Sequence, residues 1–463
     1  MKRLIWALFF VTSYIHSQTQ YTLDECQTLA RENYPLIKRY GLIDKSTEYS
    51  VANASKAYLP QLSLVVQATY QNDVAMFPEQ MAAIYEQLGM DLKGLNKDQY
   101  KVALEVNQMI WDGGVTRAGK DILIAEGNVS VQSVEVELYE LRERINQLYF
   151  GILVLDEQLR LNELLLALLQ SNYHTVEAYL KNGIALPGDL DAIKAERLSV
   201  SQQRTQIESA VEAFRRMLSV MTGKAIGDTD VLDKPEVIAD IGPYGAIAYG
   251  ASLSAADRER TATHKEILLS DIGKGMSAAG NARPELWLFD AQGARLEAQQ
   301  RAVKASTMPR LGVFIQGYYG NPGLNLFKDM TEDKWSWNYI AGLRLQWNFG
   351  AFYTKKGDMQ KLSIARQQVD NRKEVFLYHS GLQQIQQQKA IAKMRKVMAD
   401  DNEIIELRTS IRTASEAKFS NGTITVGELL RDITAESQAL LNKSLHELEW
   451  LKNIYELKYT MNN

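Results

Sequence analysis

Residues 60–70 read PQLSLVVQATY, and residues 309–319 read PRLGVFIQGYY. In both stretches apolar and polar side chains alternate, a pattern that predicts a β-strand with two different faces. Each stretch also follows an earlier proline at the same spacing, Pro35 in the first copy and Pro284 in the second. A unit that recurs in this way predicts an internally duplicated fold.

Each copy holds a second alternating segment, so the sequence predicts two strand pairs. They join residues 62–70 with 102–110 and residues 311–319 with 341–349. Strands of about nine residues are long enough to cross a bilayer when they are tilted. The polar rows are expected to face a lumen and, being of mixed chemistry, to show no selectivity. They comprise Ser63, Gln67, Thr69, Glu105, Asn107, Gln316, Arg344, Gln346 and Asn348.

The first residues carry the features of an export signal. Lys2 and Arg3 precede an apolar run that ends in small polar residues, which predicts a signal peptide at residues 1–17. Without these basic residues the formal charge falls from −4 to −6, which argues against a nucleic-acid partner. No later apolar run approaches the roughly 18 residues of a membrane-spanning helix. Cys26, the only cysteine, has acidic neighbours, so we expect a half-buried helix residue and no lipid anchor.

Long helices are predicted for most of the remaining chain. Apolar residues recur every three or four positions from Leu138 to Leu180, interrupted by Asn162, which predicts a coiled coil. Proline is absent from residues 79–186 and from residue 323 onward, so neither long arm contains the commonest helix breaker. Helices of about 70 residues, at ~1.5 Å per residue, would be on the order of 100 Å long. Helices of this length do not fit within a compact domain.

The two long arms end in similar sequences. Residues 182–189 read NGIALPGD, and residues 421–428 read NGTITVGE. Asn-Gly supplies a left-handed helix stop, and the acidic residue suits the start of a returning helix, so each arm is predicted to form a helical hairpin. We expect a first repeat at residues 18–222, a loop-rich equatorial connector at 223–263 and a second repeat at 264–463.

Several segments together resemble the outer membrane efflux proteins of the TolC family. They are TLDEC at residues 22–26, YLPQL at 58–62, WDGG at 111–114, and the glycine and acidic residues of both tips. The resemblance implies a cell outer membrane location with a large periplasmic portion. It implies a mainly α chain with a small β part, made of two long coiled-coil hairpins and four transmembrane strands. It also implies a homotrimer, closed as a twelve-stranded barrel and a helical tunnel, which works with a periplasmic adaptor and an inner-membrane pump of RND, ABC or MFS type.

Backbone hydrogen bonding supports the trimer independently of the resemblance. Four strands from one chain leave two open edges, and each unsatisfied polar group in lipid costs several kcal/mol, so a barrel must close between chains. Eight strands from a dimer would have an interior nearly filled by side chains. Twelve strands from a trimer would enclose a usable lumen.

Candidate functional residues gather at the hairpin tips. The arms stop there with small and apolar side chains exposed together, so the tips are expected to contact the adaptor. This set is Gly183, Ile184, Ala185, Leu186, Gly422, Thr423, Ile424 and Thr425. In TolC-like channels acidic residues of the second tip form rings that narrow the entrance, and the resemblance places Glu428 in that constriction. The pattern then departs from the family, because Arg431 stands where family members have a second acidic residue, with Asp432 one step beyond, so the ring of the expected constriction at Glu428, Arg431 and Asp432 would be single. Two other roles stay open for Glu428, an ion pair with Arg431 that holds the tip closed or simple capping of its helix.

No pattern typical of enzyme chemistry is found in the sequence. It has no Gly-x-Ser-x-Gly, no phosphate-binding glycine loop and no HExxH, and its histidines lack ligand spacing. We therefore expect no catalysis, cofactor or metal, and a passive exit duct for an efflux or type I secretion system. The alternative is a periplasmic coiled-coil scaffold or adhesin whose strands form a small soluble sheet. The transported substrate stays open, because the pump would choose it.

Overall fold

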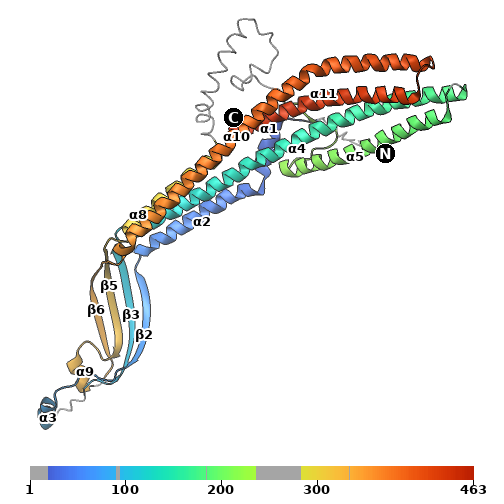
Figure 1. Ribbon diagram of the computed structural model, residues 1–463. Coiled ribbons are helices and arrows are strands. Elements are labelled where there is room, and N and C mark those ends of the chain that lie inside the picture. Colours follow the sequence, from blue (N-terminus) through green and yellow to red (C-terminus); the bar gives the residue numbers. More distant parts are fainter. Residues whose placement is uncertain (1–18, 90–93, 184, 236–282, 333, 463) are drawn as a thin grey trace, which may run out of the picture. The chain divides into compact units, whose positions relative to one another are not determined.

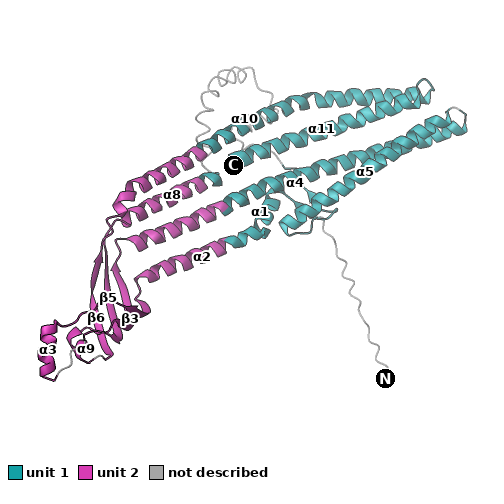
Figure 2. Cartoon of the chain, turned by 60° about the horizontal axis from the view of Figure 1, so that its bottom comes forward, with its two compact units in different colours: residues 1–39, 134–286, 374–463 teal, residues 40–133, 287–373 magenta. Residues whose placement is uncertain are grey.

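The computed structural model describes residues 19–89, 94–183, 185–235, 283–332 and 334–462. The predicted signal peptide and most of the predicted connector lie outside these residues. The chain divides into two compact units, shown in different colours in Figure 2. Unit 1 contains residues 1–39, 134–286 and 374–463, and unit 2 contains residues 40–133 and 287–373.

Helices make up most of the described chain. They are α1 (Leu23–Asn33), α2 (Lys38–Ser55), α3 (Glu79–Gln87), α4 (Val115–Lys181), α5 (Pro187–Thr222), α8 (Pro284–Ala305), α9 (Leu326–Glu332), α10 (Ala351–Ser420) and α11 (Val426–Met461). The long arms predicted from the sequence are α4, of 67 residues, and α10, of 70 residues. None of the helices in the described ranges combines the length and the apolar character that a membrane-crossing helix needs.

Unit 2 contains an antiparallel sheet of four strands (Figure 1). These are β2 (Gln61–Tyr70), β3 (Asp98–Trp111), β5 (Arg310–Asn321) and β6 (Ser336–Gln346), in the order β2-β3-β5-β6. The pairs β2 with β3 and β5 with β6 are the two pairs that the sequence predicts, and β3 with β5 joins them. The sheet therefore ends in two edge strands, β2 and β6.

The strand β6 lies earlier in the chain than the predicted range 341–349. It ends at Gln346 because Trp347 turns out of the ladder, and its indole Nε1 donates to the carbonyl oxygen of Thr307 at 3.1 Å. Asn348 then accepts a hydrogen bond from the Gly350 amide at 3.0 Å, which forms the turn into α10. The apolar residues that extended the alternation in the sequence thus belong to this turn. In the same way β3 begins before its predicted range, at Asp98.

The strand register gives the sheet two chemically different faces. On the apolar face Leu62 pairs with Val106, which pairs in turn with Ile315. On the polar face Glu105 lies between Ser63 and Gln316. The apolar face comprises Leu62, Leu64, Val66, Val102, Leu104, Val106, Ile315, Tyr319, Leu343 and Leu345, and the polar face includes Ser63, Gln67, Lys101, Glu105, Phe314, Gln316, Tyr318 and Arg344.

The apolar face has no cover among the described residues. Leu64 is 68% exposed and Leu343 is 71% exposed. A contiguous apolar surface of this kind marks a contact with lipid or with another apolar surface. The polar face is the more enclosed of the two, since Lys101 and Gln316 are half-buried and Tyr318 is buried.

The core of unit 1 forms where α1 meets the unit 1 parts of α4, α5 and α11. Its buried members include Phe150 of α4, Leu218 of α5 and Leu451 of α11. Tyr149 lies among them, with its hydroxyl within hydrogen-bonding distance of the carbonyl oxygens of Tyr21, at 2.8 Å, and Asp233, at 2.6 Å. Tyr21 ends the short strand β1 (Gln20–Tyr21), and Asp233 directly follows β4 (Val231–Leu232), with which β1 pairs in parallel. The core thus ties β1 to the segment around β4, which lies in the predicted connector.

Cys26 is fully buried in this core, whereas the sequence predicts a half-buried residue. Burial is the main cause that raises the pKa of its thiol to about 12, and the nearby Glu25 carboxylate adds to the shift. The side chain therefore stays a neutral thiol and packs as a small apolar group.

We expect Leu218→Ala to destabilise unit 1 by about 2–5 kcal/mol, because it leaves a cavity where the side chain is 0% exposed. The neighbouring substitution Val220→Ala is the matched control, since Val220 is 72% exposed in the same helix, and its cost should stay within about 0.5 kcal/mol. Urea unfolding followed by helical circular dichroism measures both. Equal losses for the two variants would contradict this core.

Candidate functional site

The candidate site is the pair of tips at which α4 turns into α5 and α10 turns into α11. Gly183 and Gly422 have φ angles of 74° and 71°, the left-handed conformation that the Asn-Gly sequences predict. Each glycine amide bonds back to its helix, to Leu180 at 3.1 Å and to Phe419 at 2.9 Å. The two long helices are therefore stopped by the same local geometry.

The two tips are packed on one another within unit 1. We call the buried residues that they share the tip cluster, which comprises Val176, Ile193, Phe419, Val426, Leu429 and Ile433. Tyr179 of α4 reaches across to Phe419 of α10, with the ring centroids 5.7 Å apart. Because the cluster draws on α4, α5, α10 and α11, the two hairpin tips form one packed body.

The residues that the sequence assigns to adaptor contact fall into two groups in the structure, one exposed and one partly buried. Gly183, Gly422, Thr423 and Thr425 are exposed, and Leu186 is 71% exposed. Ala185 and Ile424 are instead partly buried against the tip cluster, so they support the tips rather than form their outer surface. Ile184 lies outside the described residues. Helical spacing cannot distinguish these two roles, because both tip sequences lie in turns.

Glu428 caps the start of α11. Its carboxylate accepts hydrogen bonds from the Thr425 amide at 2.9 Å and the Thr425 hydroxyl at 3.1 Å, and its own amide donates to Thr425 Oγ1 at 3.3 Å. This reciprocal pair is a capping box. The bonds from Thr425 lower the pKa of Glu428, and the positive charges of Arg431 and Lys418 lower it less. In the single chain, therefore, the capping role is realised.

The other two predicted constriction residues differ from Glu428. Asp432 accepts a hydrogen bond from the Ser415 hydroxyl at 2.6 Å, so its carboxylate lies at the seam between α11 and α10. Arg431 is exposed, and among the described residues it forms no ion pair with Glu428. The closing ion pair considered from the sequence is thus not formed in this chain. A ring would need other copies of Glu428, so it stays a prediction.

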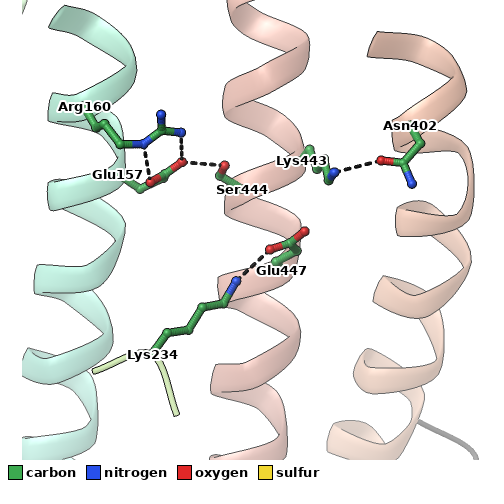
Figure 3. A network of polar contacts seen from close by, with 7 residues as sticks. All are labelled: Glu157, Arg160, Lys234, Asn402, Lys443, Ser444 and Glu447. Carbon is green, nitrogen blue, oxygen red and sulfur yellow. Dashed lines mark hydrogen bonds and ion pairs between the residues drawn. The ribbon is translucent and has the colours of Figure 1, made fainter. Parts of the chain in front are cut away.

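A polar network joins α4 to the second hairpin in another part of unit 1 (Figure 3). Glu157 of α4 accepts from Arg160 at 2.6 Å and from the Ser444 hydroxyl of α11 at 2.7 Å. Lys234 reaches Glu447 of α11 at 2.6 Å. A cavity of ≈ 720 Å³ lies beside these contacts. Sequence reasoning missed this network, because its members are far apart in the chain and share no motif.

A model of the family described as outer membrane efflux protein matches residues 28–224, which confirms the resemblance indicated by the sequence motifs. No curated protein matches the chain.

Several solved structures share the fold over 95% of this chain. A membrane protein from Pseudomonas aeruginosa has a TM-score of 0.65 at 12% identity, with 93% of its own chain covered. The outer membrane protein VceC from Vibrio cholerae has a TM-score of 0.62 at 12% identity, with 96% covered. The MtrE outer membrane channel of Neisseria gonorrhoeae in its open state has a TM-score of 0.59 at 15% identity, with 89% covered.

Gly422→Ala should loosen the second tip, because the left-handed conformation costs a residue with a Cβ atom roughly 1–2 kcal/mol although no atom lies within 4 Å of that position. Gly427→Ala, in the first turn of α11, is the matched control and should leave the tip unchanged or more stable. Hydrogen–deuterium exchange of the tip peptides measures the difference. Equal exchange in both variants would show that the turn does not depend on its glycine.

The cap of α11 should weaken in acid. Because the pKa of Glu428 is lowered from its ordinary 4.5, its stabilisation is complete above that value and is lost as pH falls through the lowered pKa. Thr425→Val removes a bond to the carboxylate, raises the pKa again and moves this loss to higher pH. Thr423→Val is the control, since the Thr423 hydroxyl bonds only the Lys418 carbonyl oxygen, at 2.9 Å. The measurement is hydrogen–deuterium exchange of the α11 amides as a function of pH, corrected for intrinsic exchange rates. The loss of protection should begin at higher pH in Thr425→Val than in Thr423→Val. Identical pH profiles would contradict the contribution of Thr425 to the cap.

Proposed function

We propose that this chain is the outer membrane channel-tunnel of a tripartite efflux or type I secretion system, because a model of the outer membrane efflux protein family matches residues 28–224. In this role it is a passive exit duct. An inner-membrane pump of RND, ABC or MFS type supplies the energy, and a periplasmic adaptor joins pump and duct. The observation that carries the proposal is a sheet with an uncovered apolar face in the same chain as two long helical hairpins.

The apolar face supports placement of the strands in the outer membrane. Leu62 and Leu345 are each 67% exposed. Contact of such apolar side chains with hydrocarbon is favourable in free energy relative to their contact with water. The scaffold or adhesin alternative would leave this whole face in water, and no feature of the described residues favours it.

The open edges of the sheet support a homotrimer. In lipid the free backbone groups of β2 and β6 need partner strands, which a second and a third copy of this chain would provide. Three copies would close a twelve-stranded barrel with its polar faces inward. The lumen would then be lined by residues such as Gln67, Glu105 and Gln316.

The hairpin tips are proposed to serve as the periplasmic entrance. The exposed residues Gly183, Leu186, Gly422, Thr423 and Thr425 would form the adaptor contact, with Ala185 and Ile424 holding them in place. Around a threefold axis Glu428 and Arg431, both exposed, would line the constriction. Asp432 would contribute less, because Ser415 already bonds its carboxylate.

A charge placed on each face of the sheet tests this function. Leu64→Arg puts a cation on the apolar face and should cost roughly 2–4 kcal/mol near the bilayer midplane, so little trimer should assemble and export should fall. Ser63→Arg, on the polar face of the same strand, should be tolerated. The readouts are the heat-modifiable oligomer in the outer membrane fraction and the sensitivity of the cells to toxic compounds. A soluble protein, or equal assembly of both variants, would refute the proposal.

A further inference from the structure

Cations outnumber anions on the polar face of the sheet. The charged residues of the four strands are Asp98, Lys101, Glu105, Arg310 and Arg344. By register Lys101 lies opposite Gln67, Arg310 opposite Gln346 and Arg344 opposite Gly312, all on the polar face with Glu105. Asp98, the other carboxylate, pairs with Tyr70 at the end of the sheet and belongs to the row of the apolar face.

Aromatic rings hold two of these cations in place. The Lys101 Nζ atom lies 4.6 Å from the centroid of the Tyr318 ring and donates to Gln316 Oε1 at 3.4 Å. The Arg344 guanidinium lies 4.7 Å over the Phe314 ring. A ring face attracts a cation without neutralising its charge. Within the described residues, neither Lys101 nor Arg344 has a carboxylate at ion-pair distance.

A glycine makes room for one of these stacks. Phe314 lies opposite Gly342 on β6, and a Cβ atom at Gly342 would come within 3.1 Å of the Phe314 ring. The ring therefore lies against the bare backbone, two residues from Arg344. This close fit keeps the guanidinium at the sheet surface, where it remains exposed.

The carboxylate on this face is already engaged. Gln316 donates its amide Nε2 to the Glu105 carboxylate, and the same Gln316 accepts from Lys101. Glu105 thus balances only part of the positive charge of Lys101, Arg310 and Arg344. Fixed charge of one sign along a confined path raises the local concentration of the opposite ion.

We propose that the polar face makes the barrel part of the duct select for anions, with Lys101 and Arg344 as the residues that determine this selectivity. The inference rests on the proposed function, because it requires the polar faces of several copies to line one lumen. Solutes carrying carboxylate, sulfonate or phosphate groups are the class that such a lining favours. The sequence alone suggested a lining without selectivity, because Lys101 and Arg310 lie outside the strand ranges predicted there.

The test is the chloride-to-potassium permeability ratio of the purified trimer, measured from reversal potentials in planar bilayers under a potassium chloride gradient. The double variant Lys101→Gln/Arg344→Gln should lower the ratio by about twofold or more, and each single variant should lower it by less. Glu105→Gln should raise it. Arg344→Lys keeps the charge and should keep the ratio of the parent protein.

Further controls separate this inference from its premise. Glu428→Gln at the tip reports the contribution of the entrance, so the barrel variants are also compared in that background. A parent protein that forms no channels would refute the proposed function and this inference with it. Channels whose ratio is unchanged by the double variant, or lowered by Glu105→Gln, would overturn the anion selectivity alone.

Discussion

A β-sheet in lipid needs every backbone N–H and C=O group paired, and four strands cannot provide this for themselves. β3 and β5 have neighbours on both sides, whereas β2 and β6 each have one. The apolar face adds a second requirement, because Leu64 and Leu343 are stable only against an apolar medium. In the proposed trimer, strands from other copies would pair the two open edges, and the surrounding lipid would cover the apolar face. Such closure would turn the polar face of each sheet into part of the wall of a duct, which is why the chemistry of that face matters for the proposed function.

The helical part meets a different requirement, which is to hold two long hairpins together within one chain. The tip cluster does this with buried apolar side chains from all four helices. The Glu157–Ser444 hydrogen bond links the same hairpins through polar groups, and the Lys234–Glu447 ion pair links α11 to the segment that follows β4. Partly exposed ion pairs contribute only about 0–1 kcal/mol each, whereas burial of one Leu or Val side chain contributes about 1.5–3 kcal/mol. Buried apolar side chains, in the tip cluster and in the core of unit 1, therefore contribute most of the stabilisation between the hairpins, and the Glu157–Ser444 bond mainly fixes the alignment of α4 with α11.

Local periodicity made much of this structure predictable from the sequence. Alternation at period two identifies the faces of β2 and β5, and Asn-Gly identifies both tips because few residues adopt the left-handed conformation. Features set by distant contacts were not predictable. Trp347 continues the alternation of β6 in the sequence, but it lies outside the strand and donates a hydrogen bond to the Thr307 carbonyl oxygen. Ile424 is partly buried because it packs against the tip cluster. The partners of Glu157 and Glu447 likewise come from segments that only the folded chain brings together.

The burial of Cys26 has a practical consequence for work on this molecule. A thiol that is fully enclosed, with a pKa near 12, presents almost no thiolate to a maleimide or a methanethiosulfonate reagent at neutral pH. Because the sequence contains no other cysteine, the folded chain is expected not to react with these reagents. A cysteine introduced at an exposed position such as Leu186 or Thr423 would then be the single reactive thiol of its chain. Spin labels, fluorophores and crosslinkers could be attached there without first replacing a buried core residue.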